Sequence, residues 1–471
     1  MAIKYKMTSH EAFSHDSIDS YGYDWERVGN PNITPKYPFK IYLPQTTEDI
    51  VQVINEIRKL GQQLWIRSKG HSSNDLVLTD GGCVLCTEKL NHILELDEKN
   101  LTVTVQSGVI LAQLDDYLWS KGYGLPVIGD HDHITAGGFA SVGGISPASH
   151  RYGMFVDTVQ KLDYVNWGGT VVNCSKTENP KNFYRLLTGT GRYGVIATLT
   201  IRIIHADKYK TVLKNRITHH IRLDKFLEAS YKVISNPGNC VMERGVWLDI
   251  PIGGINLKFG QFSAYYETSQ NWFKRLWNDV AYYVPHTIGL WAGRLPDKID
   301  LIAKYVGMAS IMFSPRYATI KNVERFTDKI LDSTVGDPTR MFIVLAPQAA
   351  YAELLKKLYK LSVDYRKEHK CFTFISIYVK AIHSEYLAQG NPKKRFCEFM
   401  LYCGINPERM TQRVLEALAS QVDDLCIGNG AFRYMHTKTV KDPERRKRID
   451  PNAFYGGEDN YIIGPPVLSL D

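Results

Sequence analysis

A loop of small and polar residues follows directly after a strand-like apolar run. The run Leu64-Trp65-Ile66-Arg67 leads into residues 68–74, which read Ser-Lys-Gly-His-Ser-Ser-Asn. Backbone N–H groups bind a phosphate best where they converge and the side chains around them are small. The loop therefore predicts a phosphate contact at the end of a strand.

A second segment, residues 130–153, is the most glycine-rich of the chain and contains the pairs Gly137-Gly138 and Gly143-Gly144. Glycine lets a backbone approach a ligand closely and adopt positive φ angles. Either segment alone is compatible with ordinary turns. Together they favour a site for a dinucleotide, whose pyrophosphate needs such contacts.

A third glycine pattern, G-x-G-x-x-G, is formed by Gly189, Gly191 and Gly194. A dinucleotide-binding fingerprint of this kind must follow a strand and open a helix. Here the pattern follows a predicted helix and opens the β-branched run at residues 195–203. We therefore interpret it as a glycine turn and reject nicotinamide binding there. The chain contains no Walker A sequence.

Helical and strand-like patterns alternate around these loops. Thr46 and Asp49 have the spacing of a capping box for a helix over residues 47–60, and Gly61 is its expected stop. The other periodic runs predict strands at 39–43, 64–67, 83–86, 101–106, 159–165, 170–173 and 195–203, and helices at 110–120 and 180–187. The fold class expected is α+β, in which these elements carry the glycine-rich loops.

The pattern changes after residue 205. Amphipathic helices expected at 323–331, 351–368 and 407–421 alternate with strands at 341–345 and 371–379. We expect a first domain over 1–205, a substrate or cap domain over 206–431, and a C-terminal segment, 432–471, that returns to the first domain. The candidate wall residues of the cap are aromatic: Trp272, Trp277, Tyr282, Tyr283 and Trp291. The segment 277–295 is interpreted as a buried helix or a cap wall rather than a membrane contact.

Composition is that of a globular protein of 471 residues with a formal charge of +8, which suits an anionic cofactor without requiring nucleic acid. The basic run 445–448 is interpreted as a solvated helix end. Residues 1–13 lack a signal-peptide pattern, and no run reaches the roughly 18 apolar residues of a membrane span, so a cytoplasmic protein is expected. Cys83 and Cys86 are interpreted as core thiols. The oligomeric state stays open.

Five motifs in their order along the chain resemble one family. The runs PQTTEDIVQVI, SKGHSSN, GGFASVGGIS, HRYG and GTGRYGVIATLTIRI are similar to the FAD domain of the vanillyl-alcohol oxidase/p-cresol methylhydroxylase (PCMH) family, and within it most similar to cytokinin dehydrogenases. The resemblance covers about residues 36–204, with a weaker match at 450–454. It implies a two-part, PCMH-type FAD-binding domain and FAD attached covalently through His71. The cofactor-binding residues it implies are Ser68, Lys69, Gly70, His71, Ser72, Ser73, Asn74, Thr135, Gly137, Gly138, Ser141, Gly143, Gly144, Val195, Ile196 and Asn460.

The same resemblance implies a catalytic role for Asp130, which stands seven residues before Gly137, where cytokinin dehydrogenases carry their active-site Asp. Its neighbours Gly129, His131 and His133 depart from the family pattern, which leaves the substrate class open. In an extended segment Asp130 and Asp132 point one way and the two histidines the other, which disfavours a metal site.

The function that the resemblance implies is removal of a hydride from a C–H next to N or O of a small molecule, with flavin as acceptor. Two alternatives stay open: a flavin reductase fed by NADPH, and a non-catalytic basic binding protein or membrane-surface protein.

Overall fold

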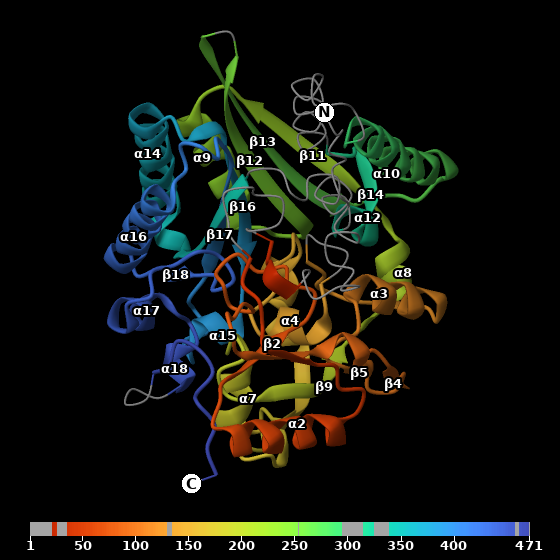
Figure 1. Cartoon of the computed structure of the whole chain (residues 1–471). Helices are drawn as coiled ribbons and strands as arrows, with labels where there is room; N and C mark the ends of the chain where they lie inside the picture. The colour runs from red at the N-terminus through yellow and green to blue at the C-terminus, as the bar shows by residue number, and fades with distance from the viewer. Residues whose placement is uncertain are drawn as a thin grey trace.

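The computed structural model describes residues 21–25, 35–129, 134–252, 254–293, 314–324, 339–456 and 461–470. Its fold is α+β, as predicted. Sheets of three and five strands lie at one end of the molecule and a sheet of eight strands at the other (Figure 1). A short pair, β6 (Tyr123–Gly124) and β10 (Ile204–His205), forms a further sheet in the described residues.

The first sheet is parallel and small, with strand order β1-β3-β2. Helix α2 (Thr47–Leu60) connects β1 (Lys40–Tyr42) to β2 (Leu64–Arg67), and β3 (Cys83–Cys86) lies between them. The predicted capping box is present, because the Thr46 hydroxyl accepts from the Asp49 N–H at 3.1 Å and the Asp49 carboxylate accepts from the Thr46 N–H at 3.0 Å. Helix α2 ends at Gly61 with a φ of 62°. The predicted boundaries of α2, β2 and β3 are confirmed, and β1 is one residue shorter at each end than the predicted strand at 39–43.

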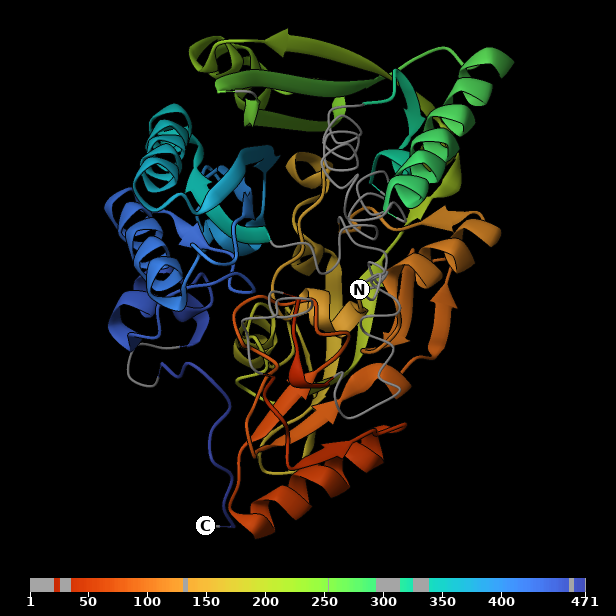
Figure 2. The ribbon, with the colours of Figure 1, turned by 45° about the horizontal axis from the view of Figure 1, so that its top comes forward.

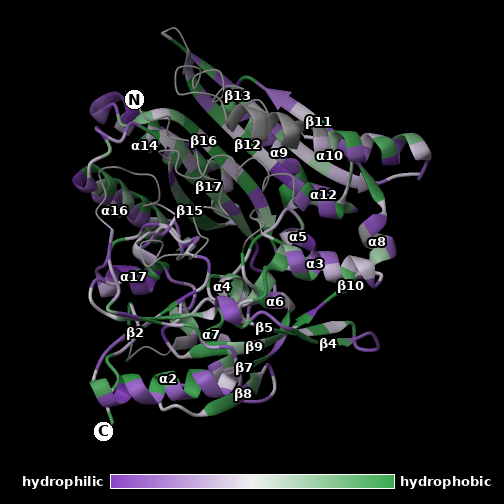
Figure 3. Cartoon of the chain, turned by 45° about the vertical axis from the view of Figure 1, so that its right-hand side comes forward, coloured by the Kyte–Doolittle hydropathy of each residue, from purple (hydrophilic) through white to green (hydrophobic). Residues whose placement is uncertain are grey.

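The second sheet is antiparallel, with strand order β4-β5-β9-β7-β8. Its apolar face packs on α2, where Ile50, Ile54 and Ile57 share a core with Val195 and Ala197. Figure 3 shows apolar and polar stripes along α2, as an amphipathic helix between a sheet and solvent requires. The bounds are β4 (Ile93–Asp97), β5 (Thr102–Gln106), β7 (Val159–Val165), β8 (Val171–Ser175), β9 (Val195–Arg202), α3 (Leu111–Ser120) and α7 (Pro180–Leu186).

The glycine-rich segment and the residues directly after it contain short helices that the sequence did not predict. They are α4 (Ala136–Ala140), α5 (Ser149–Tyr152) and α6 (Phe155–Thr158). Thr135 caps α4 by accepting from the Gly138 N–H at 3.3 Å. A glycine-rich composition argues against a helix, but this helix is short and both Phe139 and Phe155 anchor the segment in the core.

The third sheet has eight antiparallel strands in the order β14-β11-β13-β12-β16-β17-β15-β18. Helices α9 (Leu223–Ser235), α14 (Tyr351–His369) and α16 (Gln412–Gly428) pack on one of its faces (Figure 2). The strands are β11 (Val212–His220), β12 (Cys240–Ile252), β13 (Ile255–Glu267), β14 (Tyr317–Thr319), β15 (Thr339–Pro347), β16 (Phe372–Ile382), β17 (Phe396–Ile405) and β18 (Phe432–Arg433). The helix expected at 407–421 begins five residues later. The one expected at 323–331 lies mostly outside the described residues, after α12 (Ile320–Glu324).

The opposite face of this large sheet meets the first part of the chain. Ile343, Leu345 and Ile382 belong to the same apolar core as Phe139 of the glycine-rich segment and Phe155 directly after it. The two halves of the molecule are therefore packed together around one core.

The C-terminal segment runs back along the first half of the molecule. Val467 forms a bridge with Gln63, and Leu468 packs in the core beneath α2. On the way it forms α17 (Pro443–Ile449) and α18 (Ala453–Gly456). The interpretation of 445–448 as solvated is wrong for Arg446, which is 4% exposed because α17 packs on α16.

The expectation of a buried helix or cap wall over 277–295 is wrong for the first part of helix α10 (Trp272–Gly293), and the side chains beyond Tyr283 lie outside the described residues. Trp272, Trp277 and Tyr283 are 75%, 40% and 60% exposed, because the helix packs on β14 through Asn278 and Ala281 instead. The side chains of Tyr282 and Trp291 lie outside the described residues. No helix in the described ranges has both the length and the hydrophobicity needed to cross a membrane.

All eight cysteines are buried free thiols. Cys83 and Cys86 lie in β3, where burial raises the pKa of the Cys86 thiol to about 11. Their interpretation as core thiols is confirmed.

Candidate active site

A cavity lies between the glycine-rich loops of the first half and the face of the large sheet that is not covered by helices α9, α14 and α16. Its lining combines four main loop segments of the first half, around 66–72, 107, 134–145 and 186–196, with strands β15, β16 and β17 and the segment after β18. Trp25, Leu76, Val77 and Thr87 add to it. These segments are far apart in the sequence, so the cavity is a product of the tertiary fold.

The loop after β2 supplies one wall, where Ser68, Lys69, Gly70, His71 and Ser72 line the cavity. Gly70 has a φ of 75°, and a Cβ at this position would lie 2.4 Å from the Arg67 guanidinium. The His71 ring meets the Trp25 ring edge-on, with centroids 5.6 Å apart.

The glycine-rich segment supplies the adjoining wall. Thr135, Gly137, Gly138 and Ser141 line the cavity. The Gly137 N–H donates to the Ser107 carbonyl at 2.7 Å, and a Cβ on Gly137 would lie 2.6 Å from the Ser107 side chain. Only glycine allows this close approach of two backbones.

The G-x-G-x-x-G turn also lines the cavity, through residues 189–194. It is locked to the end of α4 by two backbone hydrogen bonds of 2.9 Å, from Thr188 to Ala140 and from Thr190 to Ser141. Thr188 and Thr190 both have positive φ angles, 54° and 50°. The prediction of a glycine turn holds for its shape, but the sequence reasoning missed its place in the site.

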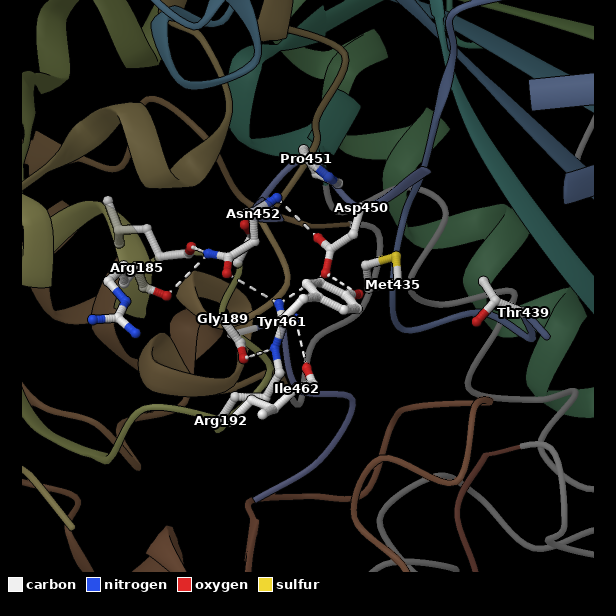
Figure 4. A network of polar contacts seen from close by, with 12 residues as sticks. Arg185, Gly189, Arg192, Met435, Thr439, Asp450, Pro451, Asn452, Tyr461 and Ile462 are labelled. Atoms are coloured by element: carbon white, nitrogen blue, oxygen red, sulfur yellow. Dashed lines mark hydrogen bonds and ion pairs between the residues drawn. The ribbon is translucent and has the colours of Figure 1, made fainter. Parts of the chain in front are cut away.

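Arg192 ties this turn to the C-terminal segment from behind (Figure 4). Its fully buried guanidinium lies 2.9 Å from the Asp450 carboxylate and donates to the Asn452 side chain at 3.1 Å and to the Ile462 carbonyl at 3.1 Å. The Tyr461 hydroxyl donates to the same Asp450 carboxylate at 2.8 Å. The C-terminal segment thereby braces the cavity wall.

Five of the predicted cofactor-binding residues do not line the cavity. Ser73 and Asn74 bond to the segment after β18, where the Ser73 N–H donates to the His436 carbonyl at 2.8 Å and the Asn74 amide donates to the Met435 carbonyl at 3.1 Å. Gly144 donates to the Tyr434 hydroxyl at 2.8 Å. The remaining two face packed side chains: Gly143 and Val195.

Strand alternation explains why Val195 is buried while Ile196 lines the cavity, because neighbouring residues of a strand point to opposite faces. Asp130, Asp132 and the two histidines beside them lie outside the described residues, as does Asn460. Gly129 and Ile134, on either side of that gap, line the cavity.

The roof of the cavity is the face of the large sheet opposite to helices α9, α14 and α16. Its lining residues alternate along each strand, since side chains two apart share a face: Met341 and Ile343 on β15, Tyr378 and Lys380 on β16, and Glu398, Met400 and Tyr402 on β17. Sequence reasoning named none of them.

Several buried polar atoms in the lining have no hydrogen-bond partner among the described residues. They come from four different segments: Ser72 Oγ, Ser107 Oγ, Thr190 Oγ1, Tyr193 Oη and His436 Nδ1. Buried polar groups are nearly always satisfied in a folded protein. Unpartnered groups that converge on one cavity indicate that a polar ligand completes them.

Charge in the lining is mostly positive. Arg67, Lys69, Arg192 and Lys380 contribute cations, and Glu398 is the carboxylate in the described lining. His436 stays neutral, because burial lowers its pKa to about 3. Lys69 is paired with Glu88 at 3.6 Å and Arg192 with Asp450 at 2.9 Å, so these cations of the loop wall are largely balanced by carboxylates behind it. The described residues contain no group of three His, Cys, Asp or Glu side chains that could hold a metal ion.

Residues 38–175 match the family described as FAD binding domain. This part of the chain is an FAD-binding domain. The resemblance drawn from the sequence motifs is thereby confirmed for the region that carries three of the four loop segments of the cavity.

Three relatives agree with this assignment. The chain is 30% identical to cytokinin dehydrogenase 2 of Arabidopsis thaliana over 38% of this chain and 36% of the relative. It is 28% identical to L-gulonolactone oxidase of Bos taurus over 36% of this chain and 38% of the relative. It is 37% identical to Delta(24)-sterol reductase of Homo sapiens over 26% of this chain and 23% of the relative. The aligned regions thus span well under half of each relative.

The cavity residues fit FAD. The small residues of the loops at 68–72 and 135–141 leave room for its pyrophosphate, and Lys69 lies in the same wall. The N–H groups of Gly137 and Gly138 are themselves bonded to Ser107 and Thr135, so they shape this wall and are not donors to the phosphate. The ribityl and ribose hydroxyls of FAD can both donate to and accept from the unpartnered Ser72, Ser107 and Thr190 hydroxyls.

Proposed function

We propose that the protein is an FAD-dependent oxidoreductase, an oxidase or dehydrogenase that removes a hydride from a C–H next to N or O of a small molecule. One observation carries the proposal: the cavity is bounded on one side by the FAD-binding domain and on the other by a separate sheet. A flavin held by the loops would meet a substrate held by the roof. The flavin supplies the redox chemistry, and the protein positions both partners.

Two residues of the first half have further proposed roles. His71 is the proposed covalent anchor, which is supported by its position in the loop wall of the cavity. Asp130 is the proposed acid or base that holds the substrate's N–H or O–H proton. The support for Asp130 is that Gly129 and Ile134, which flank residues 130–133, both line the cavity.

The test begins with the colour of the purified protein. A yellow protein with flavin absorbance is expected, whereas a colourless one would favour a non-catalytic binding protein. Acid precipitation should leave the colour in the pellet if His71 carries the flavin, and His71→Ala should release it to the supernatant. Colour in the supernatant of the unaltered protein would exclude the covalent bond and leave FAD binding intact.

Asp130→Asn keeps the shape of the side chain but cannot take a proton. It should slow flavin reduction by the substrate about 100- to 10,000-fold and leave the flavin spectrum nearly unchanged. Asp132→Asn is the control. A slow Asp132→Asn beside an unaffected Asp130→Asn would move the acid or base two residues along the chain.

A reductase is the second candidate, because relatives of the FAD-binding domain include Delta(24)-sterol reductases of Homo sapiens and Macaca fascicularis. In that case NADPH would bleach the flavin. Anaerobic mixing with NADPH, beside mixing with small alcohols and amines, separates the two candidates by which compound removes the flavin absorbance.

A further inference from the structure

A buried ion pair lies in the roof of the cavity. Lys380 Nζ and Glu398 Oε2 are 3.2 Å apart, and both side chains are almost fully buried, 4% and 3% exposed. The two residues are direct cross-strand partners of β16 and β17, and both line the cavity.

Stability alone does not account for this pair. Burying two charges costs solvation that their attraction only roughly offsets, so apolar side chains of similar volume would serve the sheet equally well. On the opposite face of the same strands the cross-strand pair Val379 and Phe399 is apolar and packs under the helices. The charged pair thus occurs on the face that meets the cavity.

The surroundings of the pair restrict what it can recognise. Met341, Ile343 and Met400 lie on the same sheet face and are apolar, and Tyr378 and Tyr402 add aromatic surface. The other cations of the lining, at 67, 69 and 192, belong to the FAD-binding side. A ligand under the roof therefore meets an apolar surface with one donor and one acceptor side by side.

We propose that Lys380 and Glu398 form a binding site for the hydroxyl group of a neutral, otherwise apolar substrate. A hydroxyl accepts one hydrogen bond and donates another, so its oxygen accepts from the Lys380 ammonium while its O–H donates to the Glu398 carboxylate. An ammonium or carboxylate ligand gains little from a pair that carries one charge of each sign, because attraction to one partner is offset by repulsion from the other, and it must also lose its hydration. The inference rests on the proposed function. Among substrates with a C–H bond next to N or O, it selects alcohols.

Three probes with one carbon skeleton test the site: 1-methylcyclohexanol, 1-methylcyclohexylamine and 1-methylcyclohexane-1-carboxylate. None has a hydrogen on the carbon that bears the functional group, so none is oxidised there and binding is measured apart from turnover. The readout is the rise in unfolding temperature of the purified holoprotein with probe concentration, which yields a Kd. The alcohol is expected to bind at least 10-fold more tightly than either charged probe.

Single variants should weaken the binding of the alcohol probe specifically. Lys380→Met and Glu398→Gln each remove one hydrogen bond to a charged group, and a loss of roughly 10- to 100-fold in alcohol affinity is expected. The exposed pair Lys176 and Glu385, 2.9 Å apart, gives the control: Lys176→Met/Glu385→Gln should bind the alcohol as the unaltered protein does. FAD content should stay the same in every variant.

The double variant Lys380→Met/Glu398→Met separates binding from folding. It should be at least as stable as the unaltered protein and should bind all three probes alike. A large loss of stability would show that the pair serves the sheet, and equal binding of alcohol and charged probes to the unaltered protein, or no binding of any, would overturn the hydroxyl site. A protein without flavin that still prefers the alcohol would contradict the proposed function and leave this site standing.

Discussion

The two sides of the cavity are built in different ways. The loop wall depends on backbone, because a Cβ on Gly137 or Gly70 would lie within 2.6 Å of neighbouring atoms. The roof depends on side chains, because every second residue of β15, β16 and β17 faces the cavity while the strands themselves are fixed by their ladders.

The two sides of the cavity therefore differ in the substitutions that they can tolerate. A loop whose glycines are packed against neighbouring atoms cannot accept larger residues, so its shape stays suited to one cofactor. A sheet face can exchange side chains without moving its backbone, so it can adapt to different substrates. Relatives of the FAD-binding domain accordingly include proteins named as oxidases, dehydrogenases and reductases.

The largest effect is expected at Gly137. In Gly137→Val the added side chain overlaps Ser107 and forces apart the two backbones that are joined at 2.7 Å. Overpacking of this kind costs about 1–3 kcal/mol, and it displaces the wall that Thr135, Gly138 and Ser141 form in the cavity. Flavin bound per protein, measured by absorbance after purification, should fall at least 10-fold.

Gly428→Ala is the matched control, because a Cβ there meets no atom within 4 Å and the position lies at the end of α16. It should keep full flavin content. A Gly137→Val protein that also kept its flavin would show that the loop wall is less restrictive than its geometry indicates.

The next largest effect is expected from breaking the ion pair of Arg192 and Asp450 behind the loop wall, and it concerns the stability of the fold. Asp450→Asn leaves the buried Arg192 guanidinium without the carboxylate that lies 2.9 Å away. Removing one partner of a buried ion pair costs about 3–5 kcal/mol. The urea midpoint of unfolding should drop strongly, and the glycine turn that Arg192 holds should loosen with it.

Glu228→Gln removes one charge of the exposed pair Lys225 and Glu228, which are 59% and 71% exposed. No measurable change is expected, because solvent screens such pairs. Equal midpoints for Asp450→Asn and Glu228→Gln would mean that the C-terminal segment does not brace the wall.

Sequence reasoning predicted the loop wall far better than the roof, for physical reasons. The glycines and small residues of the loop wall can be recognised in short stretches of the sequence, and the capping box at Thr46 marks the start of helix α2. Lys380 and Glu398 are 18 positions apart, and only the register of β16 against β17 makes them neighbours.

The glycine turn shows a second kind of failure. The pattern at 189, 191 and 194 follows helix α7 and precedes strand β9, the reverse of the strand-to-helix order that a dinucleotide-binding fingerprint requires. Its role as a cavity wall depends on hydrogen bonds to Ser141 and Ala140, some fifty residues away in the chain. No local signal contains that information.

A smaller effect is expected on the pH dependence of stability, which should differ between a buried group near the roof and one on the loop side. Burial raises the pKa of Glu243, next to the roof, to about 8, and burial lowers the pKa of His436, on the loop side, to about 3. A raised carboxyl pKa stabilises the folded state below the ordinary value of 4.5, and this stability is lost as pH rises through 8. A lowered histidine pKa has the opposite sign, so stability is lost as pH falls from 6.5 toward 3.

Between pH 6.5 and 8 the Glu243 contribution is the one of the two that changes. Unfolding midpoints measured across this window should fall with pH in the unaltered protein and fall less in Glu243→Gln, which keeps the acceptor for the Ala381 N–H. His436→Gln should alter only the acid side, below pH 6.5. Identical pH profiles for Glu243→Gln and the unaltered protein would show that the carboxyl is not held protonated.

The smallest effect, at Ser107, should change sign with the cofactor. Its hydroxyl is buried, lines the cavity and has no hydrogen-bond partner among the described residues, so the FAD-free protein bears the cost of an unsatisfied polar group. Ser107→Ala removes that group and should raise the stability of FAD-free protein, made in riboflavin-limited cells, by about 1 kcal/mol. In FAD-bound protein the same change should lower stability by about 0.5–1.5 kcal/mol, because one hydrogen bond to the cofactor is lost. Ser120→Ala, whose hydroxyl is exposed and bonds to the Tyr117 carbonyl of its own helix at 2.6 Å, should respond identically with and without FAD. If Ser107→Ala changed stability in the same direction in both forms, the unpartnered hydroxyls of the loop wall would not be cofactor ligands, and the difference between the two sides of the cavity would rest on its glycines alone.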